Sequence, residues 1–188
     1  MLVTFVSQLL SVLTVVGQGL GIGLLALIVK TKARPPALGR DLPPLVTRNA
    51  LLFAFIVALT ATLGSLFYSE VAKYTPCLLC WYQRIFMYPQ TLLLGLATLK
   101  KDAKIAAYSL TLSLVGLVIA AYHYSLQINP NPLAPCSTVG YSVSCSQRFA
   151  AEYGYITIPM MSLTAFALIA LAMIILKLSQ KPLVKPRK

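Results

Sequence analysis

The sequence predicts an all-α integral membrane protein, built as a four-helix transmembrane bundle with one extra N-terminal transmembrane helix. Two observations carry this prediction. Of the 188 residues, 58% are hydrophobic and only 11% are charged, a balance that a soluble domain does not have. Long stretches also lack Asp, Glu, Lys and Arg, and four of them reach the ~20 residues that a helix needs to cross a membrane.

The uncharged stretches mark the expected helices, at 1–29, 49–69, 85–99, 105–126 and 153–176. The short stretch at 85–99 gives only about 22 Å of helix, less than the ~30 Å of a typical membrane core. We therefore expect this helix to begin earlier, near Cys77 and Cys80. Pro76 suits its first turn, and Pro89 is expected to kink it.

The net charge of +12 indicates orientation in a membrane rather than a nucleic-acid surface. Thirteen of the 16 basic residues fall within 30–48, 100–104 and 177–188. Because cytoplasmic loops collect Lys and Arg, we expect these segments inside the cell, with five spans, the N-terminus outside and the C-terminus inside. Both cysteine-containing segments then lie on the extracytoplasmic face, where disulfides are permitted. Anionic lipid headgroups are the expected counter-charge.

Four segments follow from this pattern: an extra N-terminal transmembrane helix at 1–30, a basic Pro-rich cytoplasmic linker at 31–48, a four-helix domain at 49–178 and a basic cytoplasmic tail at 179–188. The first helix has no basic residue before Lys30, so it is not expected to be a cleaved signal peptide. Its glycines form two Gly-x-x-x-Gly pairs, at 17/21 and 19/23. They either let another helix approach closely or only loosen this one.

All four cysteines fall into two pairs, Cys77 with Cys80 and Cys136 with Cys145. Cys77, Cys80 and Arg84 are spaced three and four residues apart, so they share one helix face. A helix N-terminus and a nearby arginine bring a cysteine pKa down to roughly 3.5–7.5. The resulting thiolate is a good leaving group, and the arginine can also hydrogen-bond a carbonyl acceptor dissolved in the lipid.

Other interpretations of these residues stay open. A Cys-x-x-Cys can be half of a zinc site, although the chain has only one histidine and no second close pair. Two inert structural disulfides would make the protein a non-enzymatic membrane scaffold. Arg84 can be an interface anchor that extends to the headgroups. His123, the only histidine, is either part of an aromatic belt or a donor that handles protons for an acceptor.

Several stretches resemble the disulfide bond formation protein B family. The motif Pro-Cys-Leu-Leu-Cys-Trp-Tyr-Gln-Arg at 76–84 carries the resemblance, with its flanks over 61–99. The segments around His123 and Cys136 and the Tyr-Ile-Thr-Ile-Pro at 155–159 also fit. The resemblance is closest to the Gram-positive-type branch, the disulfide formation protein C group, and covers roughly residues 49–178.

The resemblance implies a bacterial plasma-membrane protein that reoxidises an extracytoplasmic thioredoxin-like thiol oxidase (DsbA-like). Electrons would pass to a membrane quinone of the menaquinone or ubiquinone type, with no metal and no nucleic acid involved. Cys77 and Cys80 would be the quinone-facing pair, with Cys80 next to the quinone. Arg84 and His123 would contact the quinone ring.

The resemblance also assigns the second pair to the soluble partner. Cys136 would form the mixed disulfide with that partner, and Cys145 would relay to Cys77. Two features depart from the family pattern: the extra helix at 1–29 and the close spacing of the loop pair.

Overall fold

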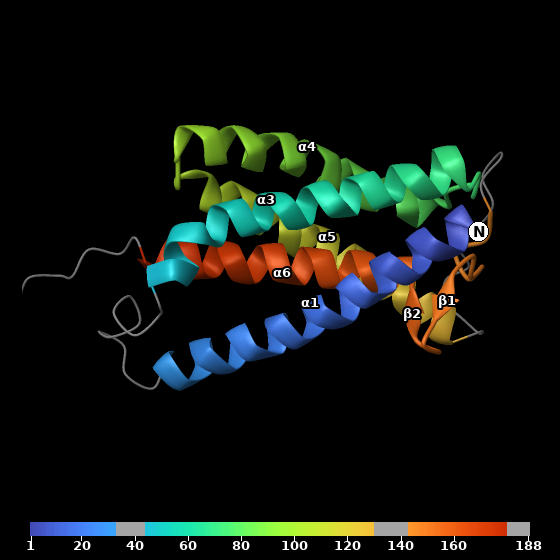
Figure 1. Cartoon of the computed structure of the whole chain (residues 1–188), viewed down its shortest axis with the longest axis horizontal. Coiled ribbons are helices and arrows are strands. Elements are labelled where there is room, and N and C mark those ends of the chain that lie inside the picture. Colours follow the sequence, from blue (N-terminus) through green and yellow to red (C-terminus); the bar gives the residue numbers. More distant parts are fainter. Residues whose placement is uncertain (33–43, 130–142, 180–188) are drawn as a thin grey trace, which may run out of the picture.

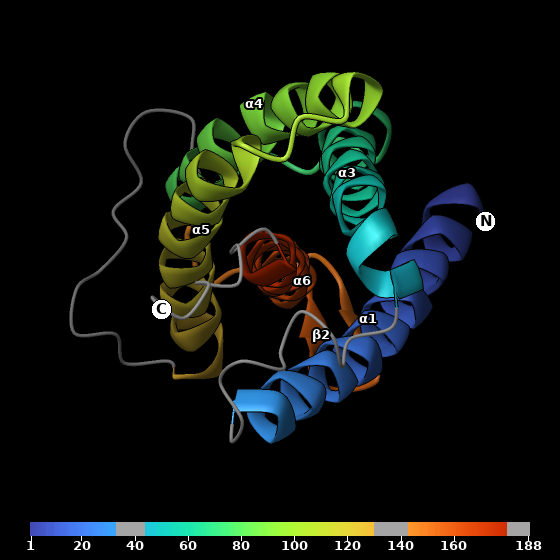
Figure 2. The same ribbon diagram turned by 90° about the vertical axis from the view of Figure 1, so that its left-hand side faces the viewer.

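The structure is a computed structural model that describes residues 1–32, 44–129 and 143–179. The residues it describes form five long helices: α1 (Leu2–Lys32), α3 (Pro44–Leu66), α4 (Leu78–Lys100), α5 (Ile105–Ile128) and α6 (Ile158–Ser179). Viewed along the bundle, α6 lies inside an open ring formed by α5, α4, α3 and α1 (Figure 2). The predicted helical bundle with an additional N-terminal helix is therefore the observed architecture.

Four segments among the described residues are long and apolar enough to cross a membrane: Leu2–Ala26, Asn49–Val71, Ile105–Ile128 and Ile158–Ser179. The remaining long helix, α4, has 23 residues but carries Gln83, Arg84 and Gln90, which lower its hydropathy. Its membrane crossing, and with it the fifth span and the orientation of the termini, stays a prediction.

The helix bounds differ from the expected ones at two proline-containing segments. Helix α3 begins at Pro44, so the last residues of the expected linker at 31–48 are helical, with a proline in the first turn, where its missing N–H costs nothing. Helix α4 does begin earlier than the uncharged stretch, at Leu78. Pro76 therefore precedes the helix and is not in its first turn as expected, because Cys77 takes the N-cap position.

Helix α6 forms the centre of the core because it is apolar on nearly every face. Phe166, Ile169 and Met173 are completely buried. Phe166 packs against Gly116 of α5 so closely that a Cβ at that glycine would lie 2.3 Å from the phenyl ring. A helix that is apolar all round is expected in the middle of a packed bundle.

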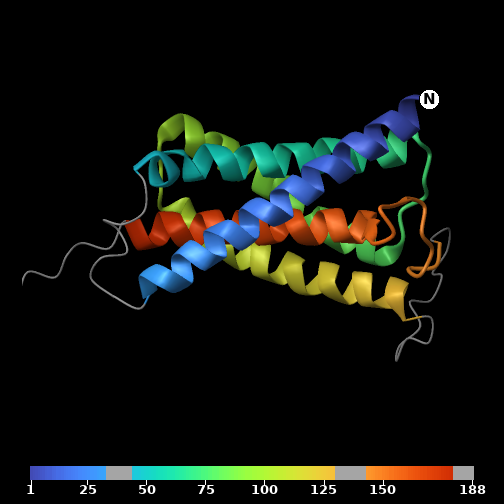
Figure 3. The same ribbon diagram turned by 60° about the horizontal axis from the view of Figure 1, so that its bottom comes forward.

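Helix α1 crosses α6 obliquely on the outside of the bundle (Figure 3). Gly17 and Gly21 face α6, where added Cβ atoms would lie 2.9 and 3.4 Å from Leu168. Gly19 and Gly23 face open space. One of the two Gly-x-x-x-Gly pairs is thus a site of close helix approach, and the other is not.

A short hairpin caps the end of the bundle where α4 begins, which we call the cysteine end (Figure 1). Strands β1 (Ala151–Glu152) and β2 (Ile156–Thr157) pair antiparallel, with Ala151 opposite Thr157. Tyr153 and Gly154 take positive φ values of 51° and 79° in the turn. The uncharged stretch predicts a helix from residue 153, but the turn delays it, and α6 begins at Ile158.

Candidate redox site

Cys77 occupies the N-cap of α4. Its backbone is extended (φ −76°, ψ 171°), and its Sγ accepts a hydrogen bond from the Cys80 amide at 3.4 Å. The sulfur thus takes the role that a Ser or Asp oxygen usually has at a helix start. Because the helix dipole places positive potential there, the position favours a thiolate.

Cys77 and Cys80 are free thiols with their sulfurs 3.0 Å apart, whereas Cys145 is disulfide-bonded. The hydrogen bond from the Cys80 thiol is the main cause that lowers the pKa of Cys77 to about 4. Burial acts in the opposite direction, and His123 adds a further lowering contribution. Cys77 is therefore the thiolate of the pair when this pair is reduced. Cys136 lies outside the described residues.

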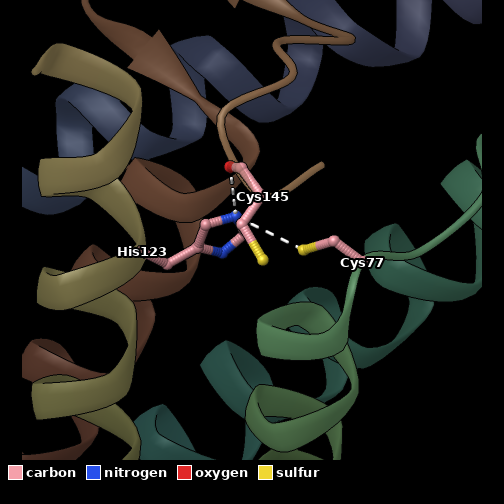
Figure 4. Close-up of side chains that lie close together, drawn as sticks. All are labelled: Cys77, His123 and Cys145. Carbon is pink, nitrogen blue, oxygen red and sulfur yellow. Dashed lines mark hydrogen bonds between the residues drawn. The ribbon is translucent and has the colours of Figure 1, made fainter. Parts of the chain in front are cut away.

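His123 connects the two cysteine-containing segments. It comes from α5 and is 2% exposed. Its Nε2 lies 3.5 Å from Cys77 Sγ and 3.2 Å from the carbonyl oxygen of Cys145 (Figure 4). The Cys77 sulfur, the Cys145 sulfur and a ring nitrogen all lie within 4.8 Å of one another. A histidine at this place can stabilise a thiolate on one segment while the other segment approaches.

Gln83 fixes the orientation of that histidine, a contact that the sequence analysis missed. Its side-chain amide lies 2.9 Å from His123 Nδ1. With the amide nitrogen donating to Nδ1, the proton of a neutral ring resides on Nε2, the nitrogen that faces Cys77. Gln83 is one of the few polar residues of α4; it is buried and lies one residue before Arg84. That placement was a signal in the sequence that a buried partner had to exist.

Arg84 is held by α3. Its Nε donates to Ser65 Oγ at 3.0 Å and its Nη2 to the Ser65 carbonyl oxygen at 3.1 Å. The Tyr88 hydroxyl donates to the same Ser65 Oγ, and the Trp81 ring lies 5.2 Å from the guanidinium carbon. Among the described residues Arg84 is thus positioned by Ser65 rather than by a cysteine. No pattern in the sequence pointed to Ser65, which comes from another helix.

A cavity of about 330 Å³ reaches this site, a size within the range of small-molecule pockets, ~300–1,000 Å³. Cys77, Cys80, Arg84, Tyr88 and His123 all line it. The expected cofactor-contacting residues therefore surround one space. A donor arginine beside a thiol at one end of an apolar cavity suits an apolar molecule with a polar carbonyl head.

The donor atoms of Cys77, His123 and Cys145 are close enough together to suggest a metal site. A structural zinc site needs four thiolate or imidazole ligands. Cys145 is in a disulfide, so its sulfur is not a thiolate. The arrangement fits exchange between sulfurs better than it fits metal binding.

Comparisons with known proteins agree with this chemistry. The family model described as disulfide bond formation protein DsbB matches residues 47–176. A probable disulfide formation protein C of Halalkalibacterium halodurans is 45% identical over 121 residues, 64% of this chain and 88% of the relative. The disulfide bond formation protein C of Bacillus subtilis is 42% identical over 135 residues, 69% of this chain and 96% of the relative.

A probable disulfide formation protein of Metapseudomonas resinovorans is 37% identical over 142 residues, 74% of this chain and 97% of the relative. No solved structure matches. The family match covers α3 to α6 and leaves α1 outside it. The chain therefore belongs to the DsbB family of disulfide bond formation proteins, which makes it a multi-pass membrane thiol oxidoreductase.

Proposed function

We propose that this protein reoxidises an extracytoplasmic thioredoxin-like thiol oxidase and delivers the electrons to membrane quinone through its two cysteine pairs. The observation that carries the proposal is the approach of the two cysteine-containing segments. The sulfurs of Cys77 and Cys145 lie within 4.8 Å of each other, with the Nε2 of His123 beside Cys77.

The first transfer takes place at the loop pair. A reduced partner thiolate attacks the Cys136–Cys145 disulfide at Cys136 and forms a mixed disulfide, which releases Cys145 as a thiolate. The second partner thiol then resolves the mixed disulfide, so the partner is oxidised and the loop pair is left as two thiols. These steps move two electrons and two protons onto Cys136 and Cys145.

The second transfer joins the two pairs. The Cys145 thiolate attacks the Cys77–Cys80 disulfide at Cys77, Cys80 leaves, and Cys136 then attacks Cys145 to release Cys77. The loop disulfide is restored and the helix pair is reduced. A sulfur with a pKa of about 4 is a good leaving group in the last step, and His123 Nε2 stabilises its charge. The described state, with Cys145 in a disulfide and Cys77 and Cys80 free, corresponds to this product.

The third transfer passes the two electrons of the reduced Cys77–Cys80 pair to an acceptor in the cavity. Cys80 and Arg84 would hold the head of a quinone there, and the quinone would supply the acceptor for the two electrons and two protons that the thiol pair releases as its disulfide re-forms. Cys80 faces the cavity, and Arg84, fixed by Ser65, donates hydrogen bonds at its polar end. Re-formation of the Cys77–Cys80 disulfide completes the cycle. The cysteine end then faces the extracytoplasmic side, where the partner is found.

A reconstituted assay tests the proposal. Purified protein in lipid is mixed with quinone and an excess of a reduced thioredoxin-like oxidase, and quinone absorbance and partner thiols are followed together. We expect one quinone reduced for each partner disulfide formed. Cys80→Ser should abolish quinone reduction, whereas Leu96→Ser, an exposed position on the same helix, should leave it unchanged. Partner oxidation without quinone loss, or activity that survives Cys80→Ser, would contradict the proposal.

A further inference from the structure

We propose that α1, the helix outside the family match, forms one wall of the quinone cavity and holds the isoprenoid tail of the quinone. This inference rests on the proposed function, because it takes the occupant of the polar end to be a quinone. It assigns a ligand-binding role to a helix that the family resemblance leaves without one.

The cavity extends far beyond the cysteines. It runs from Cys80 and Arg84 into a space between α1, α3 and α6. Helix α1 contributes Leu10, Leu13, Thr14, Gly17 and Leu20 to its lining. The family match begins at residue 47, so the matched part of the chain supplies all of the lining except the wall that α1 forms.

The shape of the cavity suits a chain rather than a compact ligand. On α3 the lining extends from Ser65 to Phe53, which is about 18 Å of helix axis at ~1.5 Å per residue. A volume of about 330 Å³ distributed along such a length is narrow. Arg84 is the only charged residue among the described residues that line it, and it lies at the cysteine end. A polar head at Arg84 with an apolar tail along α1 matches this distribution.

The cavity opens sideways between α1 and α3. Three of its lining residues are about half exposed: Leu13 (48%), Leu20 (51%) and Ile56 (52%). Thr14, on the same helix, is only 7% exposed and lies deeper. Because α1 and α3 are both apolar enough to cross a membrane, this opening faces lipid. A long tail can therefore enter from the bilayer and extend back into it.

Helix α1 is fixed firmly enough to serve as a wall. Ser7 Oγ shares a hydrogen bond with the Tyr68 hydroxyl at 3.1 Å. The Gln18 amide donates to Thr164 Oγ1 at 3.3 Å and accepts from the Tyr155 hydroxyl at 2.9 Å. Hydrogen bonds between helices are effective where water is absent. These contacts hold α1 near the cysteine end, while the close approach at Gly17 holds it on α6.

The test measures quinone binding rather than turnover. Trp81 is the only tryptophan of the chain and lies beside Arg84, so its fluorescence reports a quinone head at the polar end. The full-length protein in detergent is titrated with a quinone that carries a long isoprenoid tail and with a tail-less quinone of the same ring. Wild type should bind the long-tailed quinone more tightly than the tail-less one.

Thr14→Phe fills the cavity from α1, and Val12→Phe adds the same ring on the outward face of that helix, where the valine is 46% exposed. We expect Thr14→Phe to weaken long-tailed quinone binding about tenfold, the effect of excluding about two buried methylene groups. Binding of the tail-less quinone should not change. Val12→Phe should change neither. Leu13→Phe, which obstructs the half-exposed opening without replacing a buried residue and without adding a second tryptophan, should reproduce the effect of Thr14→Phe.

The outcomes separate the two proposals. If neither quinone quenches Trp81 in wild type, the proposed function itself fails. If both quinones quench but bind equally tightly, the cavity does not hold the tail and a lipid acyl chain is the better occupant. If Thr14→Phe and Leu13→Phe leave the preference for the long tail intact, α1 does not form the wall that holds the tail. Equal weakening of both quinones would mean that the variants disturb the head site, which also overturns the inference.

Discussion

His123 is held from both sides of its ring, and this arrangement determines what it can do. Gln83 donates to Nδ1, so Nε2 carries the proton and faces Cys77. The family resemblance predicts that His123 contacts the quinone ring. The ring does line the cavity, but its hydrogen bonds go to Gln83, Cys77 and the Cys145 backbone. We therefore expect its main effect on the thiol chemistry.

The pH dependence of the reduced helix pair follows from Cys77. Its pKa is lowered from 9.0 to about 4, so the thiolate should persist as pH falls from neutral to about 4. Ionisation of Cys77 stabilises the folded protein in the same sense as a carboxyl group whose pKa is lowered by folding. This contribution to the free energy of unfolding is complete above pH 9.0, where the unfolded thiol is also ionised, and is lost as pH falls through about 4. Thiolate ultraviolet absorbance of protein with only this pair reduced measures the titration.

Removal of the histidine should shift that titration upward. His123→Phe takes away the Nε2 hydrogen bond and its positive potential, so the midpoint of the thiolate absorbance should rise. Gln83→Leu should produce a smaller rise, because the histidine remains but its proton is no longer fixed on Nε2. Gln83→Glu replaces the donating amide nitrogen with a carboxylate oxygen that can only accept from Nδ1, so it should favour a charged imidazole. A midpoint that stays unchanged in His123→Phe would show that Cys80 and the helix start alone set the pKa of Cys77.

At the scale of elements, long helices were predictable from the sequence because the membrane fixes their length and excludes charge. The uncharged stretch at 105–126 became α5 (Ile105–Ile128) almost unchanged. The hairpin at 151–157 was missed because strands of two residues carry no periodic pattern. The π-helical turn at Phe67–Val71, which ends α3, was missed for the same reason.

The packing of the helices predicts opposite effects on stability for two glycine-to-alanine substitutions. Gly116→Ala places a Cβ 2.3 Å from the fully buried ring of Phe166, so the ring or the two helices α5 and α6 must shift. Overpacking of this kind costs typically ~1–3 kcal/mol. Gly19→Ala adds the same methyl group to α1 where nothing lies within 4 Å, so stability should hold or rise slightly. Unfolding of the purified protein with increasing denaturing detergent measures both, and equal midpoints would contradict the packing at Gly116.

At the scale of the whole molecule, the site joins segments that the sequence could place only in part. Cys80 and Arg84 were predictable as neighbours because a four-residue spacing places them on one helix face, with Cys77 just before them at the N-cap. The contacts of Gln83 with His123 and of Arg84 with Ser65 depend on how two helices slide along each other. No local pattern encodes that register, so only the folded structure reveals these partners.

The approach of Cys145 to Cys77 is the whole-molecule contact on which the relay depends, and it can be trapped. A variant with Cys80→Ser and Cys136→Ser keeps only Cys77 and Cys145, whose sulfurs lie within 4.8 Å. A disulfide needs about 2.05 Å, a gap that side-chain rotation and a small loop shift can close. We expect this variant to form the cross-link in air without added catalyst, detected as loss of both free thiols and by mass spectrometry. Exchange through mixed disulfides should make the link reversible by a mild dithiol.

The matched variant with Cys77→Ser and Cys136→Ser keeps Cys80, one helical turn further on, and should cross-link more slowly. Two thiols that stay free in the first variant would show that the loop does not deliver Cys145 to Cys77, and the relay between the pairs would need another route.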